Sequence, residues 1–189
     1  FLIGKNFNWR KQNIGNGSWA TTAFFYLDKP FSSVPNIANI EQRLKNLQLE
    51  SLDVLLLHTW TRAWNDRPKA LEILHKIKAE GLINNVGLST PEHDQNCVID
   101  LMRKGLLDAV QVIYNIFEQE PAAQLLPVAK ETGTAVIIRV VFDEGVLTGK
   151  YKGDETFGKD DFRSNYYAGD RLLRSVKRMI VQLERSQLQ

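Results

Sequence analysis

Two side chains able to do chemistry follow directly after an apolar run. Leu52–Leu57 is almost entirely apolar, and His58 and Trp60 come at its end. A run of this length predicts a strand of a parallel sheet that is buried on both faces. The chemistry of such sheets lies at the carboxyl ends of their strands. His58 is therefore a candidate catalytic residue, and the alternative is a core histidine bonded to a backbone carbonyl.

Three further short strands also carry or lead into polar side chains. The patterns predict them at Asn85–Ser89, Ala109–Ile113 and Ala135–Val141. Gln111 lies inside the second of these strands and, when buried, needs a hydrogen-bond partner from the protein, from water or from a ligand. Arg139 interrupts the third strand. These positions are the remaining candidates for a site at the strand ends.

Helices are predicted between the strands, where apolar residues recur at three- and four-residue spacing. A polar loop, Asp143–Lys150, follows the last strand, and a basic amphipathic helix covers Leu172–Leu183. Four other helices are predicted. The first begins at a Pro35–Asn36 cap, the second ends at Gly81, the third begins at Pro91–Glu92, and the fourth runs from Pro121 to Gly133. Strand and helix thus alternate, and right-handed crossovers would make the strands parallel neighbours.

Such a pattern fits either a (β/α)8 barrel or a doubly wound sheet. A doubly wound sheet usually has a glycine-rich phosphate loop after its first strand, and the sequence contains no G-x-G-x-x-G motif. We therefore expect an α/β protein with the (β/α)8 TIM-barrel fold and a single domain over residues 1–189. The strands readable from the sequence would be the fourth to seventh of the barrel.

The first 36 residues carry weaker patterns. Phe1–Lys5 is predicted to end a helix, and Ile14–Gly17 to form a turn or the remnant of a strand. Trp19–Leu27 is predicted to be an irregular aromatic loop, which either packs locally or contacts a ligand.

Composition limits the possible partners. Of the 189 residues, 43% are hydrophobic and 24% are charged, as in ordinary globular proteins. The net charge of +2 comes without basic runs, so we expect no nucleic-acid partner. The single cysteine, Cys97, fits a reducing compartment, and no apolar run reaches the ~18 residues of a membrane span. These features predict a cytoplasmic protein with no membrane contact and no bound metal, and they leave the oligomeric state open.

Four motifs come in fixed order, namely Leu55–Trp60, Gly81–Ser89, Val110–Asn115 and Gly145–Tyr151, and two further stretches are Ile138–Gly145 and Asp161–Tyr166. The four motifs resemble the aldo-keto reductases, and the two further stretches resemble a bacterial subgroup of that family. The resemblance implies a (β/α)8 barrel that uses NADPH or NADH to reduce an aldehyde or ketone to an alcohol by hydride transfer. It also implies a tyrosine as general acid, with a histidine, a lysine and an aspartate around it.

The resemblance also implies roles for residues at the strand ends. His58 matches the family histidine that orients the substrate carbonyl, and Trp60 would line the substrate pocket. Ser89 and Gln111 match residues that hold the nicotinamide carboxamide, which needs one donor and one acceptor. Thr90 stands where the family commonly has asparagine, so one anchor is weakened or replaced.

The last strand and the loop after it would also hold the cofactor. Arg139 stands where many members have an aromatic ring against the nicotinamide. A guanidinium can stack on that ring but would repel its oxidised form, or it could hold a phosphate or a carboxylate. Phe142, Asp143, Gly145 and Lys150 match the segment that wraps the pyrophosphate. Asp143 would then face the phosphates with its backbone.

Parts of the family pattern have no match in the sequence. We found no counterpart for the tyrosine, the aspartate, a clear lysine or the eighth strand, and a whole barrel typically needs about 250 residues. The chain therefore looks truncated at both ends. Two interpretations follow: part of a longer working reductase, or a truncated or degenerate relative that acts as a non-catalytic nicotinamide-binding or scaffold protein.

Overall fold

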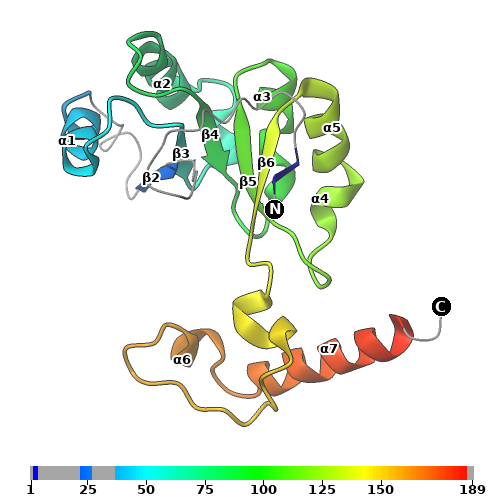
Figure 1. The fold of residues 1–189 in the computed structure, drawn as a ribbon. Coiled ribbons are helices and arrows are strands. Elements are labelled where there is room, and N and C mark those ends of the chain that lie inside the picture. The colour runs from blue at the N-terminus through cyan, green and yellow to red at the C-terminus, as the bar shows by residue number, and fades with distance from the viewer. Residues whose placement is uncertain (1, 4–21, 27–36, 187–189) are drawn as a thin grey trace. The chain divides into compact units, whose positions relative to one another are not determined.

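The computed structural model describes residues 2–3, 22–26 and 37–186 (Figure 1). The chain divides into two compact units. The first comprises Phe1–Tyr114 and Glu118–Arg139, and the second comprises Asn115–Phe117 and Val140–Gln189. The prediction of one domain over residues 1–189 stays a prediction.

The first unit is built on a six-stranded sheet with the order β1-β6-β5-β4-β3-β2. The strands β2 to β6 run parallel to their neighbours, and β1 pairs antiparallel with β6. The strands are β1 (Leu2–Ile3), β2 (Thr22–Tyr26), β3 (Val54–His58), β4 (Val86–Ser89), β5 (Ala109–Ile113) and β6 (Ala135–Arg139). The four strands predicted from the apolar runs, β3 to β6, are confirmed.

Helices connect successive parallel strands, as the alternating pattern predicts (Figure 1). Where a helix was expected from Pro91, a 3-10 turn and a short helix begin later. The helical elements of this unit are α1 (Ile37–Leu47), η1 (Arg62–Trp64), α2 (Lys69–Ala79), η2 (Gln95–Val98), α3 (Ile99–Arg103), α4 (Glu120–Ala123) and α5 (Leu125–Thr132).

Two predictions for the first 36 residues were wrong. Trp19–Leu27 was expected to be an irregular loop, but Thr22–Tyr26 forms β2 and pairs in register with β3. Aromatic and β-branched residues favour strands, and that preference applies here to the sequence Thr-Ala-Phe-Phe-Tyr. Leu2–Ile3 was expected to end a helix, but it pairs with Ile137 and Val136 as β1. Ile14–Gly17 lies outside the described residues.

The two faces of the sheet have different cores. Alternate strand residues, among them Leu55, Leu57 and Leu88, pack against the helices in one large cluster. The helix residues of that cluster include Leu71, Leu74, Ile77, Leu101, Leu125 and Val128. The opposite face has a small cluster of Val54, Leu56, Ala109 and Ala135. We call the first face the helix face and the second the inner face.

Cys97 belongs to the helix-face core and is 1% exposed. Burial, followed by the nearby negative charge of Asp94, raises the pKa of its thiol to about 12. The thiolate is the reactive form of cysteine, so this residue acts as a small apolar side chain.

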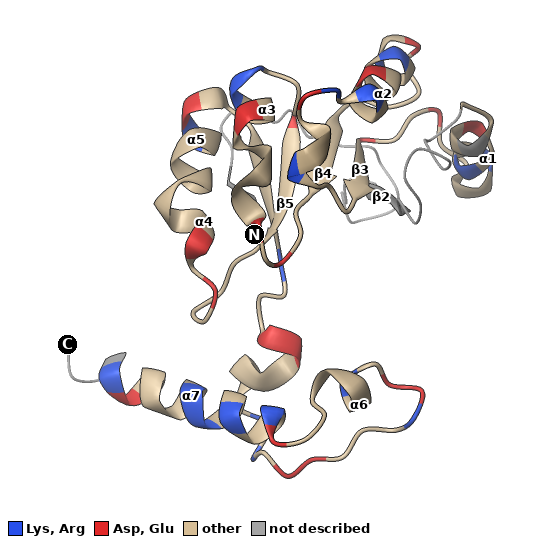
Figure 2. Ribbon diagram, turned by 180° about the vertical axis from the view of Figure 1, so that it is seen from behind, with Lys and Arg blue, Asp and Glu red and all other residues tan. Residues whose placement is uncertain are grey.

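The second unit contains η3 (Asp143–Thr148), α6 (Arg163–Tyr166) and α7 (Arg171–Ser186). One side of α7 packs through Leu172, Val176 and Met179 onto Val146 and Tyr167, which form a separate core. In Figure 2 the Lys and Arg positions, in blue, are spaced along the ribbon of α7, which confirms the basic amphipathic helix predicted for this part of the chain. Among the described residues, no helix has the length and apolar character that crossing a membrane requires.

β6 is shorter than predicted because of its backbone. The sequence pattern extends to Val141, but the strand ends at Arg139 and Val140 has φ = 55°. A β-branched residue rarely adopts this left-handed conformation, which is incompatible with an extended strand. Arg139 therefore becomes the last residue of β6, and its side chain lies at the carboxyl end of the sheet.

Gly87 in β4 gives a test of how tightly the inner face is packed. A Cβ atom at this position would collide with Cδ2 of Leu56 and lie 2.9 Å from the carbonyl oxygen of Ala109. We expect Gly87→Ala to lower the free energy of unfolding by about 1–3 kcal/mol, the usual cost of overpacking. Urea denaturation measures the free energy of unfolding. Gly158→Ala is the control, because a Cβ at that position meets open space. Equal effects of the two substitutions would contradict this account.

Candidate active site at the carboxyl end of the sheet

The polar residues predicted from the strand ends share the inner face of the sheet. In parallel strands, paired residues point to the same face and alternate residues point to opposite faces. Ser89 is paired with Gln111, and Leu57 with Leu88, so His58 occupies the row of Ser89 and Gln111. This row follows Val54 and Leu56 of the inner-face core at two-residue intervals. Three of the predicted residues therefore form one line across β3, β4 and β5.

Arg139 lies on the same face, one step further towards the carboxyl end. It is paired with Ile113, two residues beyond Gln111. Its Nη2 donates a hydrogen bond of 3.1 Å to the carbonyl oxygen of Thr90, which fixes the guanidinium beside the end of β4. The structure thus brings His58, Ser89, Gln111 and Arg139 to one edge of one face.

Ser89 and Gln111 are bonded to each other. Oγ of Ser89 donates to Oε1 of Gln111 at 3.2 Å, and the two residues are 0% and 8% exposed. The partner that a buried Gln111 requires is therefore a neighbouring side chain. This bond leaves the Gln111 amide nitrogen as a donor and the Ser89 oxygen as an acceptor, which is the pair that a primary amide needs.

Thr90, which replaces the asparagine expected from the resemblance, is also buried and occupied. Its Oγ1 donates to the carbonyl oxygen of Gln111 at 3.1 Å, and its backbone N–H donates to the same oxygen at 2.9 Å. Thr90 thus extends the pairing of β4 with β5 beyond the last strand residue. Its side chain serves the backbone of the site.

The surroundings of His58 lower the pKa of its imidazole and so favour the neutral ring. Burial is the larger cause that lowers its pKa from the usual 6.5, and the positive charge of Arg139 is the second. A neutral imidazole has one N–H donor and one acceptor nitrogen. At pH 7 the ring can therefore donate a hydrogen bond without adding a charge.

Trp60 lies in the helix-face core and is 2% exposed. Its indole N–H donates to Oδ1 of Asn65 at 2.8 Å, and its ring meets Trp64 edge-on at 5.2 Å between centroids. These contacts fix the chain just after His58. The role of Trp60 in a substrate pocket stays a prediction.

The loop predicted to hold phosphates belongs to the second unit. Asp143 has φ = 44° and its carbonyl oxygen accepts a 2.7 Å hydrogen bond from Oη of Tyr167. Gly145 has φ = 106°, and Phe142 is 60% exposed. Lys150 is exposed as well. The roles of Phe142, Asp143, Gly145 and Lys150 toward a cofactor stay predictions.

Sequence reasoning missed a buried residue that holds the end of β5. Gln95 is fully buried, and its Oε1 accepts the backbone N–H of Ile113 at 2.6 Å, beyond the reach of β4. Recognition of β2 as a strand would also have drawn attention to Lys29, three residues after the strand ends and outside the described residues. In the described part of the chain, no cluster of His, Cys, Asp or Glu could hold a metal ion.

Known proteins resemble both the sequence and the structure. The Aldo-keto reductase YhdN of Bacillus subtilis is 28% identical over 130 residues, which cover 68% of this chain and 38% of that protein. The NADH-specific methylglyoxal reductase of Escherichia coli is 22% identical over 140 residues, covering 70% of this chain and 41% of that protein. The chain thus spans about two fifths of the length of these relatives.

Solved structures support the fold. The glycerol dehydrogenase from Gluconobacter oxydans superimposes with a TM-score of 0.57 and 26% identity, over 75% of this chain and 43% of that one. The holo aldo-keto reductase from Bacillus halodurans gives a TM-score of 0.53 at 22% identity, over 65% and 40%. The chain has the TIM-barrel fold of these enzymes, of which the described strands β2 to β6 form a parallel sheet with its helices.

The whole sequence pattern from the first regular helix to the last agrees with this likeness. Residues 34–185 match the Aldo/keto reductase family. That range includes β3 to β6, the strand-end residues and the loop of the second unit. The chain therefore belongs to the aldo/keto reductase family.

Proposed function

We propose that the protein reduces an aldehyde or ketone to an alcohol with NADPH or NADH. The observation that supports this proposal most is the row formed by His58, Ser89 and Gln111 on the inner face. A hydrogen-bond donor for a carbonyl thus lies beside a pair of groups that suits an amide. Membership of a family of oxidoreductases supports the same reaction.

The side chains at the strand ends fit a nicotinamide. Its carboxamide requires an acceptor for its N–H groups and a donor for its oxygen. The oxygen of Ser89 supplies the first and the amide nitrogen of Gln111 supplies the second, because their mutual bond occupies the other atoms of the pair. When bound there, the reduced nicotinamide supplies the hydride.

His58 would act on the substrate oxygen. As carbon accepts the hydride, the carbonyl oxygen becomes an alkoxide and gains negative charge. A neutral imidazole N–H within hydrogen-bond reach stabilises that charge more in the transition state than in the ground state. The resemblance assigns the proton donor to a tyrosine for which we found no counterpart in the sequence, so the proposal gives His58 the orienting role.

Arg139 adds a fixed positive charge to this edge of the sheet. Its guanidinium is held by the Thr90 carbonyl oxygen and lowers the pKa of His58. In the proposed site it would favour negative charge on the substrate oxygen and disfavour the positively charged, oxidised nicotinamide. The first effect favours reduction of the carbonyl, whereas the second weakens binding of the oxidised nicotinamide and opposes hydride transfer to the substrate.

The loop after β6 would bind the pyrophosphate, through Phe142, the Asp143 backbone, Gly145 and Lys150. Lys29 is the candidate for the lysine that the resemblance implies, because it follows the strand that precedes β3. Trp60 remains the candidate for the substrate pocket.

The proposed substrate is a small carbonyl compound. We also propose that the protein is cytoplasmic and has no nucleic-acid or membrane partner. Relatives carry names such as methylglyoxal reductase and aflatoxin B1 aldehyde reductase. One relative is named as NADH-specific, so both nicotinamides should be tested. The fluorescence of NADPH and of NADH during titration of the purified protein measures binding, and loss of absorbance with small aldehydes measures turnover. Binding without turnover would favour the non-catalytic alternative.

Substitution of His58 separates chemistry from binding. We expect His58→Ala to lower kcat by roughly 100-fold or more, the usual contribution of a positioned acid or base group, with cofactor affinity within about twofold of the parent protein. Steady-state kinetics measure kcat, and nicotinamide fluorescence measures affinity.

His75→Ala is the matched control for this prediction. The Nε2 atom of His75 lies 3.0 Å from the carbonyl oxygen of Leu106, so this histidine joins α2 to the segment before β5. We expect its loss to leave kcat within about twofold of the parent value, as for substitutions away from a site. Equal losses of kcat in both variants would contradict the role of His58.

The charge of Arg139 can be tested through the titration of His58. We expect Arg139→Gln to raise the pKa of His58, because the repulsion that disfavours imidazolium disappears while the burial remains. Because burial is the larger cause, the pKa should stay below 6.5. NMR titration of the imidazole C–H signals, assigned with His58→Ala, measures the change. An unchanged pKa would show that the two side chains do not interact.

A further inference from the structure

The loop after β6 has a backbone conformation that cannot be stable by itself. Asp143 and Glu144 have φ values of 44° and 52°, and Gly145 follows with φ = 106°. Three successive residues thus lie outside the right-handed region, and two of them are not glycine. Side chains with a Cβ disfavour this region, so the conformation persists only where surrounding groups hold it.

Two tyrosines hold the loop through direct contacts. Oη of Tyr167 donates to the carbonyl oxygen of Asp143 at 2.7 Å. Tyr151 packs against Gly145, where an added Cβ would lie 2.8 Å from the tyrosine hydroxyl and 3.0 Å from its ring. Tyr167 therefore contacts the loop at Asp143, and Tyr151 contacts it at Gly145.

Arg163 fixes one of these tyrosines. Its Nη1 donates to Oη of Tyr151 at 2.6 Å, while Nε and Nη2 donate to the carboxylate of Asp161 at 2.9 and 2.5 Å. The guanidinium also stands 4.7 Å from the ring centroid of Phe157. The side chains of Arg163 and Asp161 are 33% and 27% exposed, so water reaches this pair only in part.

Phe157 joins the two tyrosines into one aromatic group. Its ring meets Tyr151 edge-on with 5.7 Å between centroids and stacks on Tyr167 at 5.8 Å. The chain of contacts therefore runs from Asp161 through Arg163 and the aromatic rings to the backbone of the loop. We call Asp161, Arg163 and Tyr151 the clamp.

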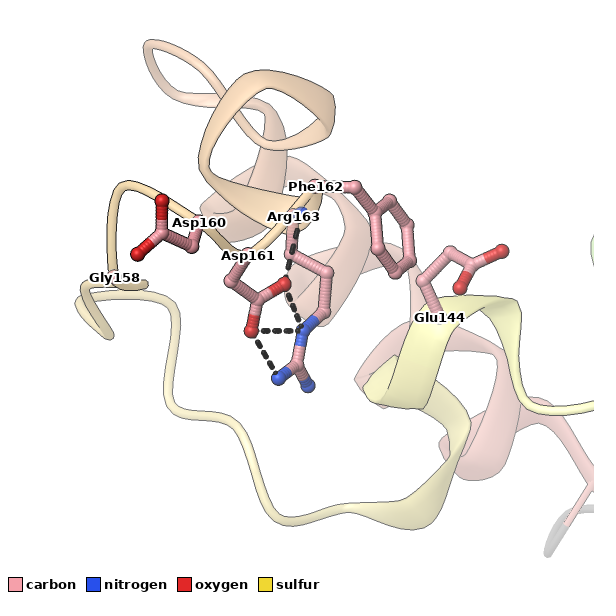
Figure 3. Close-up of a pocket in the computed structure, with 6 residues that line it drawn as sticks. All are labelled: Glu144, Gly158, Asp160, Asp161, Phe162 and Arg163. Carbon is pink, nitrogen blue, oxygen red and sulfur yellow. Dashed lines mark hydrogen bonds and ion pairs between the residues drawn. The ribbon is translucent and has the colours of Figure 1, made fainter.

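The clamp borders a hollow that does not suit a phosphate. Figure 3 shows the bidentate pair of Asp161 with Arg163, and Glu144 and Phe162 nearby. The hollow has about 680 Å³ and is lined by Glu144, Gly158, Asp160, Asp161, Phe162 and Arg163. Three of these residues carry carboxylates that repel phosphate, and Asp161 already neutralises Arg163. Arg163 is therefore placed to hold the loop and is poorly placed to bind the pyrophosphate itself.

We infer that Asp161, Arg163 and Tyr151 are positioning residues for the cofactor: they hold the loop Phe142–Lys150 in the one conformation that binds the pyrophosphate. The inference rests on the proposed function, because it assumes that this loop binds a nicotinamide dinucleotide. A loop fixed before binding loses less entropy when the ligand arrives, so its preorganisation appears as affinity. Arg163 holds the pKa of Asp161 at about 2, so the pair stays charged above about pH 4 and breaks only as the pH falls towards 2.

The direction in which Asp161→Asn changes the Kd for the cofactor separates positioning from direct phosphate binding. We expect Asp161→Asn, Arg163→Lys and Tyr151→Phe each to raise the Kd for NADPH, or for NADH if that is the cofactor bound, by about tenfold, equivalent to 1.4 kcal/mol. If Arg163 instead bound phosphate directly, Asp161→Asn would release its charge and lower the Kd. Nicotinamide fluorescence titration of the full-length protein at pH 7 measures each value.

Steady-state kinetics separate positioning from a merely structural role. At saturating cofactor we expect kcat and the KM of the carbonyl substrate to stay within about threefold of the parent values, while the KM of the cofactor follows its Kd. A merely structural role would lower the melting temperature without this division between the two KM values. Tyr151→Phe keeps the ring and removes only the hydroxyl, so it decides the case if the other variants fail to fold.

Arg62 and Asp94 provide the matched control. They form the same kind of bidentate pair in the first unit, with Nε and Nη2 of Arg62 donating to the carboxylate at 3.0 and 2.6 Å. We expect Arg62→Lys and Asp94→Asn to leave the Kd unchanged. A parent protein that binds neither nicotinamide overturns the proposed function and this inference together. A parent that binds, with clamp variants that bind equally well or better, overturns this inference alone.

Discussion

The close approach of β3, β4 and β5 is the constraint on which the site depends. Over the inner face at Gly87, Cδ2 of Leu56 occupies the space that a Cβ would need, and Ala109 follows on the next strand. Because Gly87 and Ala109 are small, the strands can stay in register while the side chain of Leu56 fills the inner face. Because register fixes which side chains share a row, this packing is what brings His58, Ser89 and Gln111 into line. A slip by one residue would turn all three into the helix-face core.

The strand-end site and the loop after β6 are held in place by different kinds of contact. The strand-end residues are held by buried neighbours, so Ser89, Gln111 and Thr90 satisfy one another where water is excluded. The loop adopts left-handed backbone at successive residues, and aromatic and charged side chains from the segment that follows hold it. Rigid strands thus support the proposed chemistry, and a supported loop is assigned to the phosphates.

Much of the sheet could be predicted from sequence, because long apolar runs and periodic helices record burial directly. Strands β3 to β6 and the candidate residues at their ends were found in this way. Thr22–Tyr26 was missed because its aromatic residues were interpreted as a loop, although Ala23–Leu27 is a continuous apolar run, and its pairing with β3 is a non-local property. The contacts of Arg163 with Tyr151 were invisible for a similar reason. Eleven mostly polar residues lie between them, and no periodic pattern indicates that such a segment folds back on itself.

The burial of Cys97 has a practical consequence for anyone who labels this protein. The sequence contains one thiol, and it lies in a closed core with a pKa of about 12, so at neutral pH it offers almost no thiolate to a maleimide or to an oxidant. A cysteine introduced on the exposed side of the loop or of α7 would then be the only fast-reacting thiol within these 189 residues. The native side chain can stay in place while a spin label or a fluorophore reports on the motion of the loop.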